Sequence, residues 1–566
     1  MIIGGGPAGS TASTLLKKYN PKLDVVVLER EKFPREHIGE SQLPPINAVL
    51  NEMGCWDKVE AANFPIKIGA TFRWGNTRDL WDFQLYPASQ FIDEPRPAKY
   101  QGQRLRTAFQ VDRATYDKIL LDHAKSLGAD VREETKVVEV LREGDKITGL
   151  KLEDGSIETA RYYVDATGGS GLLRRQMGID IVEPSSLRNI AIWDYWNNTD
   201  WAFSIGTGGT RVQVLSLGYG WIWFIPISPT RTSIGLVCPA EYYKQSGKRP
   251  EELYEQAIAD EPLITELITN GSREGVIRTT RDWSYYAERM HGENWFLIGE
   301  AAGFADPILS AGMTMAHIGG KELAYTILAL DKGELDAEWL KDQLDENQTR
   351  RVRQHIEFAD FWYTANGCFT DCKEFTKSIA ADAGLEFDAN NAFQWFASGG
   401  FMHEHMGSGF SGCDFYSFKD TIEVLTQDSA VLECEKNNHF MLNMDGATMD
   451  EFAHYADGKI NRVQRWKRGE STLPKSGLYY VIMQILQVRS DLPFVYGQMA
   501  KAVMDKGIRP DIESALAFAV GFLESMIRGG WVIATKDPNI PEYDLLVPKL
   551  TAGIRYNDDT FQHARQ

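Results

Sequence analysis

The chain has 566 residues, of which 43% are hydrophobic and 25% are charged, and these shares are those of an ordinary globular protein. Sixty basic and 79 acidic side chains give a formal net charge of −19 at pH 7, which repels nucleic acid and anionic membrane surfaces. The composition therefore excludes a disordered, collagen-like or coiled-coil chain, and the charge excludes a basic DNA-binding protein.

Cysteine usage and apolar runs indicate the compartment. Six cysteines, at positions 55, 238, 368, 372, 413 and 434, are too few and too dispersed for a disulfide framework. The one close pair, Cys368 and Cys372, lacks the second pair of Cys or His that a zinc site needs. No run of about 18 apolar residues predicts a transmembrane helix. We expect a cytoplasmic protein that binds no metal, no nucleic acid and no membrane.

The chain begins with a β-α-β pattern. Ile2–Ile3 end a first strand, and a glycine-rich turn follows at residues 4–9. A helix is predicted over Ser10–Tyr19, and Asp24–Glu29 form a second buried strand. Because a buried strand usually has about five residues or more, we expect native residues to precede Met1.

Further elements follow in chain order. Strict alternation predicts a strand over Ile66–Trp74, with Lys67, Gly69 and Thr71 together on its polar face. The other predicted elements are a helix over Asp112–Leu127, paired strands over Val131–Val140 and Ile147–Leu152, short strands between residues 190 and 240, a strand over Trp295–Gly299 and a helix over Gly312–Leu330. From about residue 338 the apolar spacing becomes helical.

This order predicts an α/β fold in two parts. Residues 1–335 form a core with an inserted β-sheet, built from residues of about 55–110 and 185–285, and residues 336–566 form a mostly helical C-terminal domain. Aromatic side chains of the second part either line a pocket or pack between helices. They are Phe358, Phe361, Trp362, Tyr363, Trp395 and Phe396.

The glycine-rich turn predicts a dinucleotide site. Gly4-x-Gly6-x-x-Gly9 lies between a strand and a helix, where glycines allow a tight turn, a close approach to pyrophosphate and close helix–strand packing. The start of the helix then presents free N–H groups to the phosphates. Glu29 ends the second strand, where an acid accepts hydrogen bonds from a ribose and disfavours a 2′-phosphate. The sequence therefore predicts FAD or NAD.

A resemblance favours FAD. The segment Gly4-x-Gly6-Pro7-Ala8-Gly9-Ser10 resembles the FAD family of aromatic hydroxylases, geranylgeranyl reductases and halogenases. Three more segments match that family in order: Arg113 with Asp117, residues 165–169 (Asp-Ala-Thr-Gly-Gly), and residues 299–307. Glu300 stands where the family usually has Asp, so we predict Asp306 as the ligand of the ribityl chain.

The resemblance implies a Rossmann-like FAD-binding domain of the aromatic-hydroxylase type. It adds an inserted antiparallel β-sheet that forms a substrate layer, and a mostly helical C-terminal region. The residues that it assigns to the cofactor are Gly4, Gly6, Pro7, Ala8, Gly9, Ser10, Glu29, Arg30, Ser41, Arg113, Val137, Asp306, Gly312 and Met313.

Further motifs narrow the resemblance to flavin-dependent halogenases. Trp221-x-Trp223-x-Ile225-Pro226 is similar to the W-x-W-x-I-P motif of these enzymes, and residues 304–312 are similar to their F-x-x-P-x-x-S-x-G motif. Lys67 stands in a Lys-x-Gly-x-x-Phe-x-Trp context like that of the family's essential lysine, after a Gly-Glu-Ser segment at residues 39–41. Leu309 stands where tryptophan halogenases carry a Glu, which favours the branch that acts on phenols or carrier-bound substrates.

The resemblance implies a mechanism. Reduced FAD from a separate flavin reductase, oxygen, and chloride or bromide bound by the amides of Ala311 and Gly312 yield hypohalous acid, beside Ser310. Lys67 then delivers the halogen to an electron-rich phenol, while Glu40 is the candidate base. The two tryptophans keep the substrate away from the flavin and so prevent direct oxygenation.

Other interpretations stay open. On their own, Trp221 and Trp223 are explained by packing in a sheet, and Lys67 by a solvated strand face. The alternatives for the whole chain are an aromatic hydroxylase, an isoprenoid reductase, or a non-catalytic flavoprotein partner in a biosynthetic assembly.

Overall fold

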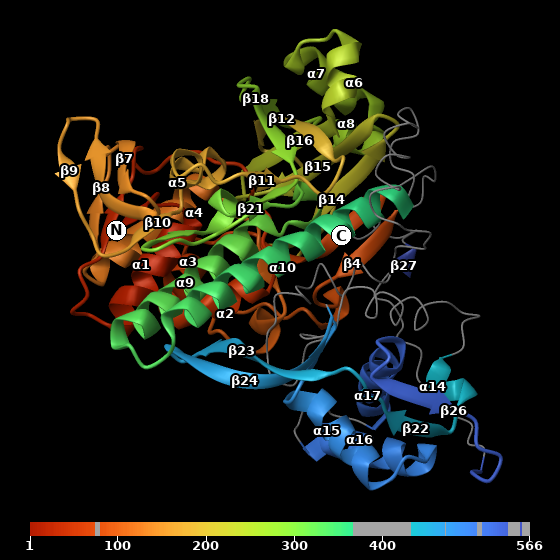
Figure 1. Cartoon of the computed structure of the whole chain (residues 1–566). Helices are drawn as coiled ribbons and strands as arrows, with labels where there is room; N and C mark the ends of the chain where they lie inside the picture. Colours follow the sequence, from red (N-terminus) through yellow and green to blue (C-terminus); the bar gives the residue numbers. More distant parts are fainter. Residues whose placement is uncertain (74–79, 366–431, 470, 506–511, 542–554, 557–566) are drawn as a thin grey trace.

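The computed structural model describes residues 1–73, 80–365, 432–469, 471–505, 512–541 and 555–556. A parallel sheet of five short strands lies near the N-terminus, in the order β20–β10–β1–β2–β6 (Figure 1). Its strands are Ile2–Ile3 (β1), Val26–Leu28 (β2), Asp130–Arg132 (β6), Tyr163–Asp165 (β10) and Trp295–Leu297 (β20). The helix after β1 is α1 (Pro7–Tyr19), which packs against the long helix α9 (Gly312–Lys332). The Rossmann-like α/β prediction is confirmed.

One predicted strand is divided between two sheets. The sequence predicted a single strand over Val131–Val140, but β6 ends at Arg132 and β7 (Val137–Glu143) pairs instead with β8 (Lys146–Leu152) and not with β2. Glu134 lies between them in a left-handed conformation, with φ 53°. That conformation interrupts an extended strand, so the chain turns away from the parallel sheet there.

The inserted sheet is large and mostly antiparallel. Its main path of neighbouring strands is β17–β12–β16–β15–β14–β3–β4–β27. The chief strands are Ile66–Arg73 (β3), Trp81–Gln84 (β4), Arg188–Asn197 (β12), Gly209–Leu217 (β14), Gly220–Pro226 (β15) and Arg231–Pro239 (β16). The smaller strands are Ala108–Phe109 (β5), Ser204–Ile205 (β13), Ser272–Arg273 (β17), Arg278–Trp283 (β18) and Arg555–Tyr556 (β27).

One pair departs from the predicted antiparallel pattern, since β14 and β3 run parallel. A parallel pair needs a long connection, and the chain between residues 73 and 209 supplies it.

The two faces of β15 have different partners. Ile222 and Phe224 pack with residues of α6 (Ala240–Ser246), α7 (Pro250–Asp260) and α8 (Pro262–Leu267) in one hydrophobic cluster. Trp221, Trp223 and Ile225 belong to the main cluster, on the side of the FAD-binding fold. Because side chains alternate across a strand, the W-x-W-x-I-P motif sends both tryptophans to one face.

Helix α10 (Ala337–Ala365) runs along the core, although the sequence predicted a domain boundary at its start (Figure 1). Arg351 of α10 donates to both carboxylate oxygens of Glu322 of α9, at 2.6 and 3.2 Å. Near its other end, α10 contributes Tyr363 to the site described below. The division at residues 335 and 336 stays a prediction.

The C-terminal region contains strands as well as helices. Its helices are Glu433–Lys436 (α14), Gly477–Val488 (α15), Leu492–Asp505 (α16) and Ile512–Arg528 (α17). Its strands are His439–Leu442 (β22), Thr448–Ala456 (β23), Lys459–Arg468 (β24), Ser471–Pro474 (β25) and Val532–Thr535 (β26). The β23–β24 hairpin contacts the core, where Ala453 donates its backbone N–H to Gln343 of α10 (2.8 Å). The helical spacing missed these strands.

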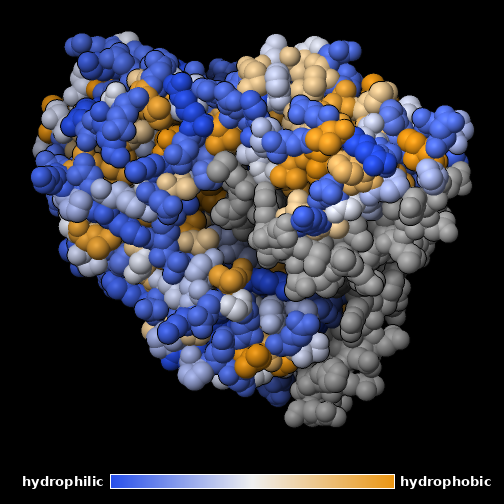
Figure 2. Space-filling view, turned by 90° about the horizontal axis from the view of Figure 1, so that it is seen from below, coloured by the Kyte–Doolittle hydropathy of each residue, from blue (hydrophilic) through white to orange (hydrophobic). Residues whose placement is uncertain are grey.

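Cys55, Cys238 and Cys434 are buried and form no disulfide bond with described residues, and the other three cysteines lie outside the described ranges. Within the described ranges no helix is long and apolar enough to cross a membrane. On the face shown in Figure 2 hydrophilic side chains predominate and hydrophobic ones form small separate patches, as is usual for globular proteins.

Candidate functional site

A cavity of about 1270 Å³ lies between the parallel sheet and the inserted sheet. It exceeds the roughly 300–1,000 Å³ of a typical ligand pocket, so it has room for a large cofactor and for chemistry beside it. The cavity is lined by the glycine turn, by residues 35–41, by the tryptophan motif and by the start of α9. Most of the site residues that the sequence predicted therefore lie around one cavity.

The glycine turn has the geometry of a dinucleotide site. A Cβ added to Gly4, whose φ is 105°, would lie 2.3 Å from the carbonyl oxygen of Ala166. A Cβ on Gly9 would lie 2.0 Å from the carbonyl oxygen of Gly4. Pro7 opens α1 directly after Gly6, so the free N–H groups of that helix start point toward the turn. The turn would hold a pyrophosphate as the fingerprint predicts.

The acid after β2 is fixed by the backbone. Glu29 is 5% exposed, and its carboxylate accepts hydrogen bonds from the N–H groups of Gly5 (2.7 Å) and Glu31 (2.9 Å). A carboxylate has about four acceptor positions, so two remain for a ribose. Arg30 is exposed and pairs with Glu31 at 3.3 Å, while Val137 is buried at the same end of the cavity.

Arg113 positions the segment that faces the cavity. It lies at the start of α4 (Arg113–Ser126) and forms two hydrogen bonds with Asp117, at 2.8 and 2.9 Å. Its Nη1 donates to the carbonyl oxygens of Ile38 (2.7 Å) and Gly39 (3.0 Å). The guanidinium group therefore holds the loop segment that carries Glu40 and Ser41.

Asp306 is a buried acid of the cavity wall. Its Oδ1 accepts hydrogen bonds from the N–H of Ile308 (2.8 Å) and the hydroxyl of Tyr363 (3.1 Å). Burial raises the pKa of Asp306 to about 7. Its Oδ2 is buried without a hydrogen-bond partner among the described residues, so it could accept or donate a bond to a ligand. Glu300, the departure from the family pattern, is partly exposed on the same cavity.

The two tryptophans of the motif are anchored by hydroxyl groups. Trp221 donates its Nε1–H to the hydroxyl of Tyr363 (2.7 Å), and Trp223 donates to the hydroxyl of Ser233 (3.1 Å). Their ring centroids are 6.0 Å apart, and both rings line the cavity. Tyr363 thus joins Trp221 to Asp306. The sequence singled out Tyr363 only as an aromatic residue, and nothing local indicated this bridge.

Three of the other aromatic residues predicted for a pocket are not placed at this site. Phe358 is buried in the main hydrophobic cluster, which is the packing alternative. Trp395 and Phe396 lie outside the described residues, as does Trp74 of the Lys67 motif.

Lys67 lies on β3 at an irregularity in the sheet. It pairs with Thr210 of β14, whereas Gly69 pairs with the very next residue, Arg211. Three residues of β3 thus span two of β14. Such a bulge re-aims a side chain, and we infer that it brings Lys67 to the face of Thr210.

The expectation that Lys67 shares a face with Gly69 and Thr71 is therefore wrong, and so is the expectation of a solvated strand. Thr71 instead donates to Asp82 (2.7 Å), which is paired with Arg211. All residues of β3 from Ile66 to Phe72 are buried.

The amine of Lys67 is isolated from charge. Lys67 is 3% exposed, and its Nζ donates to the carbonyl oxygen of Gln42 (3.1 Å). Burial lowers the pKa of Lys67 to about 7, and no carboxylate among the described residues pairs with it. The side-chain amides of Gln42 and Gln110 are also buried. The amide of Gln42 faces the hydroxyl of Tyr116, and that of Gln110 makes no hydrogen bond with described residues.

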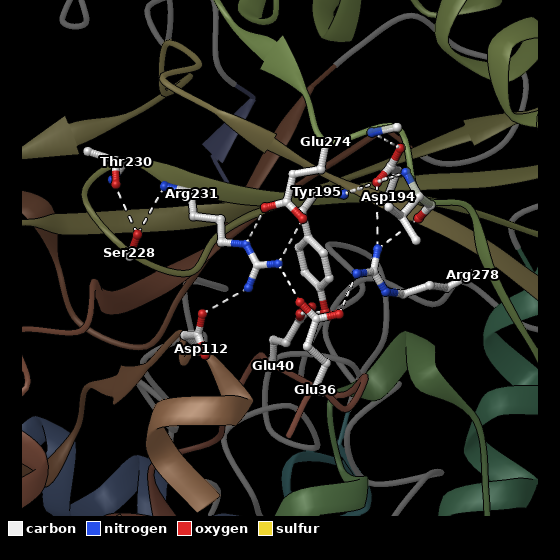
Figure 3. A network of polar contacts seen from close by, with 12 residues as sticks. Glu36, Glu40, Asp112, Asp194, Tyr195, Ser228, Thr230, Arg231, Glu274 and Arg278 are labelled. Carbon is white, nitrogen blue, oxygen red and sulfur yellow. Dashed lines mark hydrogen bonds and ion pairs between the residues drawn. The ribbon is translucent and has the colours of Figure 1, made fainter. Parts of the chain in front are cut away.

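Glu40 belongs to a polar network at the cavity (Figure 3). Its Oε1 accepts a hydrogen bond from the hydroxyl of Tyr195 (2.7 Å), and burial raises the pKa of Glu40 to about 7. The ring of Tyr195 lies between Arg231 and Arg278, whose guanidinium carbons are 3.9 and 4.8 Å from its centroid. Ser41 is buried beside Glu40, and its hydroxyl has no partner among the described residues.

The predicted halide segment precedes α9. Ser310 has a left-handed φ of 54°, which is uncommon for a residue with a side chain. Ala311 is the N-cap of α9 and Gly312 its first residue, with open space around the position of a Cβ on Gly312. These residues and Met313 line the cavity. The start of this 21-residue helix, where backbone N–H groups lack partners within the helix, therefore lies at the cavity wall.

Comparison with known proteins decides the family. Residues 1–359 match the family described as FAD binding domain. A 1H-pyrrole-2-carbonyl-(peptidyl-carrier protein) chlorinase of Pseudomonas fluorescens is 32% identical over 384 residues, which are 65% of this chain and 84% of that protein. The chain belongs to the flavin-dependent halogenases.

Other relatives agree with this assignment. A tryptophan 2-halogenase of Chondromyces crocatus is 31% identical over 59% of this chain and 62% of its own length. Among solved structures, the flavin-dependent halogenase CmlS shares the fold with a TM-score of 0.71 at 22% identity, over 96% of this chain and 97% of that one. The myxobacterial chondrochloren halogenase CndH is 28% identical, with a TM-score of 0.57 over 70% of this chain and 95% of that one. This flavin-dependent halogenase is therefore an FAD-binding oxidoreductase.

Proposed function

We propose that this halogenase uses FAD, oxygen and chloride or bromide to halogenate an electron-rich aromatic ring, preferably a phenol, either free or bound to a carrier protein. The observation that carries this proposal is the amine of Lys67. It is buried, it lacks a carboxylate partner among the described residues, and its pKa of about 7 leaves a large neutral fraction at neutral pH.

The residues of the cavity fit FAD. Gly4 and Gly9 form a turn that a Cβ would block, and Glu29 is held ready for a ribose. Asp306 and Ser41 offer polar atoms that have no partner among the described residues. The chemistry supplied by bound, reduced FAD is the activation of oxygen, which oxidises the halide to hypohalous acid. We propose that a separate flavin reductase supplies the reduced cofactor.

The chain's own residues have three tasks. The amides of Ala311 and Gly312 would bind the halide beside Ser310, because N–H groups at a helix start attract anions. Trp221 and Trp223, which line the cavity, would separate this part of it from the aromatic substrate. The neutral amine of Lys67 would accept the halogen from hypohalous acid with release of water, or hold the acid by a hydrogen bond.

The ring then takes the halogen and loses a proton, so a base is required. Glu40 is the candidate among the cavity residues, because its carboxyl group is close to half ionised near pH 7. The buried amides of Gln42 and Gln110 would bind the polar end of the substrate near Lys67.

The relatives support several aromatic substrates. One relative's name specifies a pyrrole on a peptidyl carrier protein, another's specifies tryptophan, and a third is named sulochrin halogenase. A phenol is the preferred substrate class, since its own oxygen activates the ring toward an electrophilic halogen. The second candidate function is an aromatic hydroxylase, which shares the FAD-binding fold.

The test is an incubation with FAD, a generic flavin reductase, NADH, oxygen and bromide, with a panel of phenols and their carrier-bound thioesters, read by mass spectrometry. We expect a brominated product that disappears in Lys67→Ala. Lys151→Ala is the matched control, because Lys151 is an exposed lysine of β8 that pairs with Glu139. A product heavier by one oxygen would show hydroxylation, and the absence of any product would leave a non-catalytic flavoprotein.

A further inference from the structure

Two buried carboxyl groups lie on the wall of the cavity, and each accepts a hydrogen bond from a tyrosine hydroxyl. Glu40 and Asp306 are both 2% exposed, and both line the cavity. In each, one oxygen has its hydrogen bonds and the other, Oε2 of Glu40 or Oδ2 of Asp306, is buried without a partner among the described residues. An unpaired buried acid oxygen on a cavity wall is costly in the ionised form.

No ion pair joins Glu40 to a cation among the described residues, and the two guanidinium groups near it in Figure 3 contact Glu36 instead. Arg231 and Arg278 lie over the ring of Tyr195, but their guanidinium groups bind the carboxylate of Glu36. Arg113, from α4, faces Glu40 and favours its ionised form, while Asp112 opposes it. The guanidinium group of Arg113 donates its hydrogen bonds to Asp117 and to two backbone carbonyl oxygens. The hydroxyl of Tyr195, from β12, donates a hydrogen bond to Glu40, and the hydroxyl of Ser233, from β16, also favours its ionised form. Both hydroxyl groups are neutral.

Asp306, unlike Glu40, has no charged side chain among the groups that shift its pKa. The groups that face it are the backbone N–H of Ile308, the hydroxyl of Tyr363 from α10 and the side-chain amide of Asn189 from β12, and all of them are neutral. No ion pair joins Asp306 to a cation within the part of the chain that the structure describes.

An ionised carboxylate in such surroundings repels an anion across the cavity, and low dielectric makes this repulsion strong. The start of α9, which would bind halide, opens onto the same space as both acids. We propose that Glu40 and Asp306, as buried acids of the same cavity wall, carry protons when halide is bound, so that halide enters the cavity together with protons. This inference rests on the proposed function, because it uses the halide site at Ala311 and Gly312.

The direction of the pH dependence follows from the two acids. Burial raises the pKa of each to about 7, so both are neutral below that pH and ionise above it. Halide affinity should therefore be constant below about pH 6 and should fall as pH rises. Above pH 7, ionisation of each carboxyl group would lower the halide affinity by up to about tenfold per pH unit.

Other titratable groups behave differently. Burial and then Arg113 lower the pKa of His37, which favours its neutral form. Burial opposes the charge of Glu36, but Arg231 and Arg278 outweigh it and lower the pKa of Glu36, so this acid stays ionised. Lys67 titrates near pH 7, but it is not among the residues that line the cavity.

The experiment is calorimetric titration of the FAD-loaded protein with sodium bromide at about pH 6, 7 and 8, each in two buffers of different ionisation enthalpy. The difference between buffers gives the number of protons taken up with each bromide. We expect almost no uptake at pH 6 and up to two protons at pH 8, with the dissociation constant rising in parallel. Glu40→Gln and Asp306→Asn should each remove up to one proton of uptake at pH 8.

Two variants serve as controls. Glu36→Gln changes a carboxylate of the same cavity that stays ionised, and Lys67→Met removes the amine, so both should keep the proton uptake of the wild type. Bromide binding without proton uptake at pH 8, or uptake lost in Lys67→Met, would overturn the inference and leave the halide site standing. No bromide binding at any pH would overturn the halide site itself, and with it this part of the proposed function. Flavin absorbance shows that each variant holds FAD.

Discussion

Replacing Lys67 by methionine should stabilise the folded chain near neutral pH while it abolishes halogenation. The amine is fully buried, and burial lowers its pKa from 10.5 to about 7. Between these two values the unfolded chain holds a proton that the folded chain lacks. The free energy of unfolding of the wild type therefore rises with pH over this window, and the cost of burying Lys67 is greatest at pH 7 and below.

The size of the effect follows from the shift. Raising the pH from 7 to 9 should recover about 2 kcal/mol of the wild-type stability at this site. Methionine fills a similar volume and does not titrate, so Lys67→Met should be more stable than the wild type at pH 7 and should lose about 2 kcal/mol of that advantage at pH 9. Other titrating groups are common to both proteins and cancel in the difference.

The assay is guanidinium-induced unfolding of both proteins at several pH values between 7 and 9. Lys67→Arg is the matched control, because a guanidinium remains protonated throughout and should stay destabilised relative to methionine at every pH. A difference between wild type and Lys67→Met that is the same at pH 7 and pH 9 would refute the reasoning. It would mean that Lys67 is charged in the folded chain, and a neutral amine would then be lost as the basis of halogen transfer.

Two further predictions concern the cofactor turn and the bridge from α10. Gly9→Ala should lose FAD binding, measured by flavin absorbance after gel filtration, because its Cβ would lie 2.0 Å from the Gly4 carbonyl oxygen. Gly497→Ala, at an exposed position of α16 with open space around the added Cβ, should keep FAD. FAD retained by Gly9→Ala would contradict the role of the turn. Tyr363→Phe should lower the unfolding free energy by about 1–3 kcal/mol in thermal or chemical denaturation, because it removes the hydroxyl that accepts a hydrogen bond from Trp221 and donates one to Asp306. An unchanged unfolding free energy would show that this hydroxyl does not restrain the two tryptophans.

The sequence by itself determined the features that depend on neighbouring residues. The Gly4–Gly9 turn, the helix that follows it and the acid at Glu29 lie within 30 residues, and their spacing is sufficient to predict the β-α-β unit. The alternation in β15 likewise sends Trp221 and Trp223 to one face. These are properties of backbone geometry with short periods, so a linear pattern can carry them.

Only the tertiary structure decided where Lys67 points and what surrounds the acids. The face of Lys67 depends on the register between β3 and β14, which are joined by a long connection, and simple alternation gave the wrong neighbours. Trp221 and Asp306 meet through Tyr363, which is 142 residues from the first and 57 from the second. The raised pKa values of Glu40 and Asp306 arise from burial by such distant segments. Desolvation is a property of packing in three dimensions, and a local sequence pattern does not contain it.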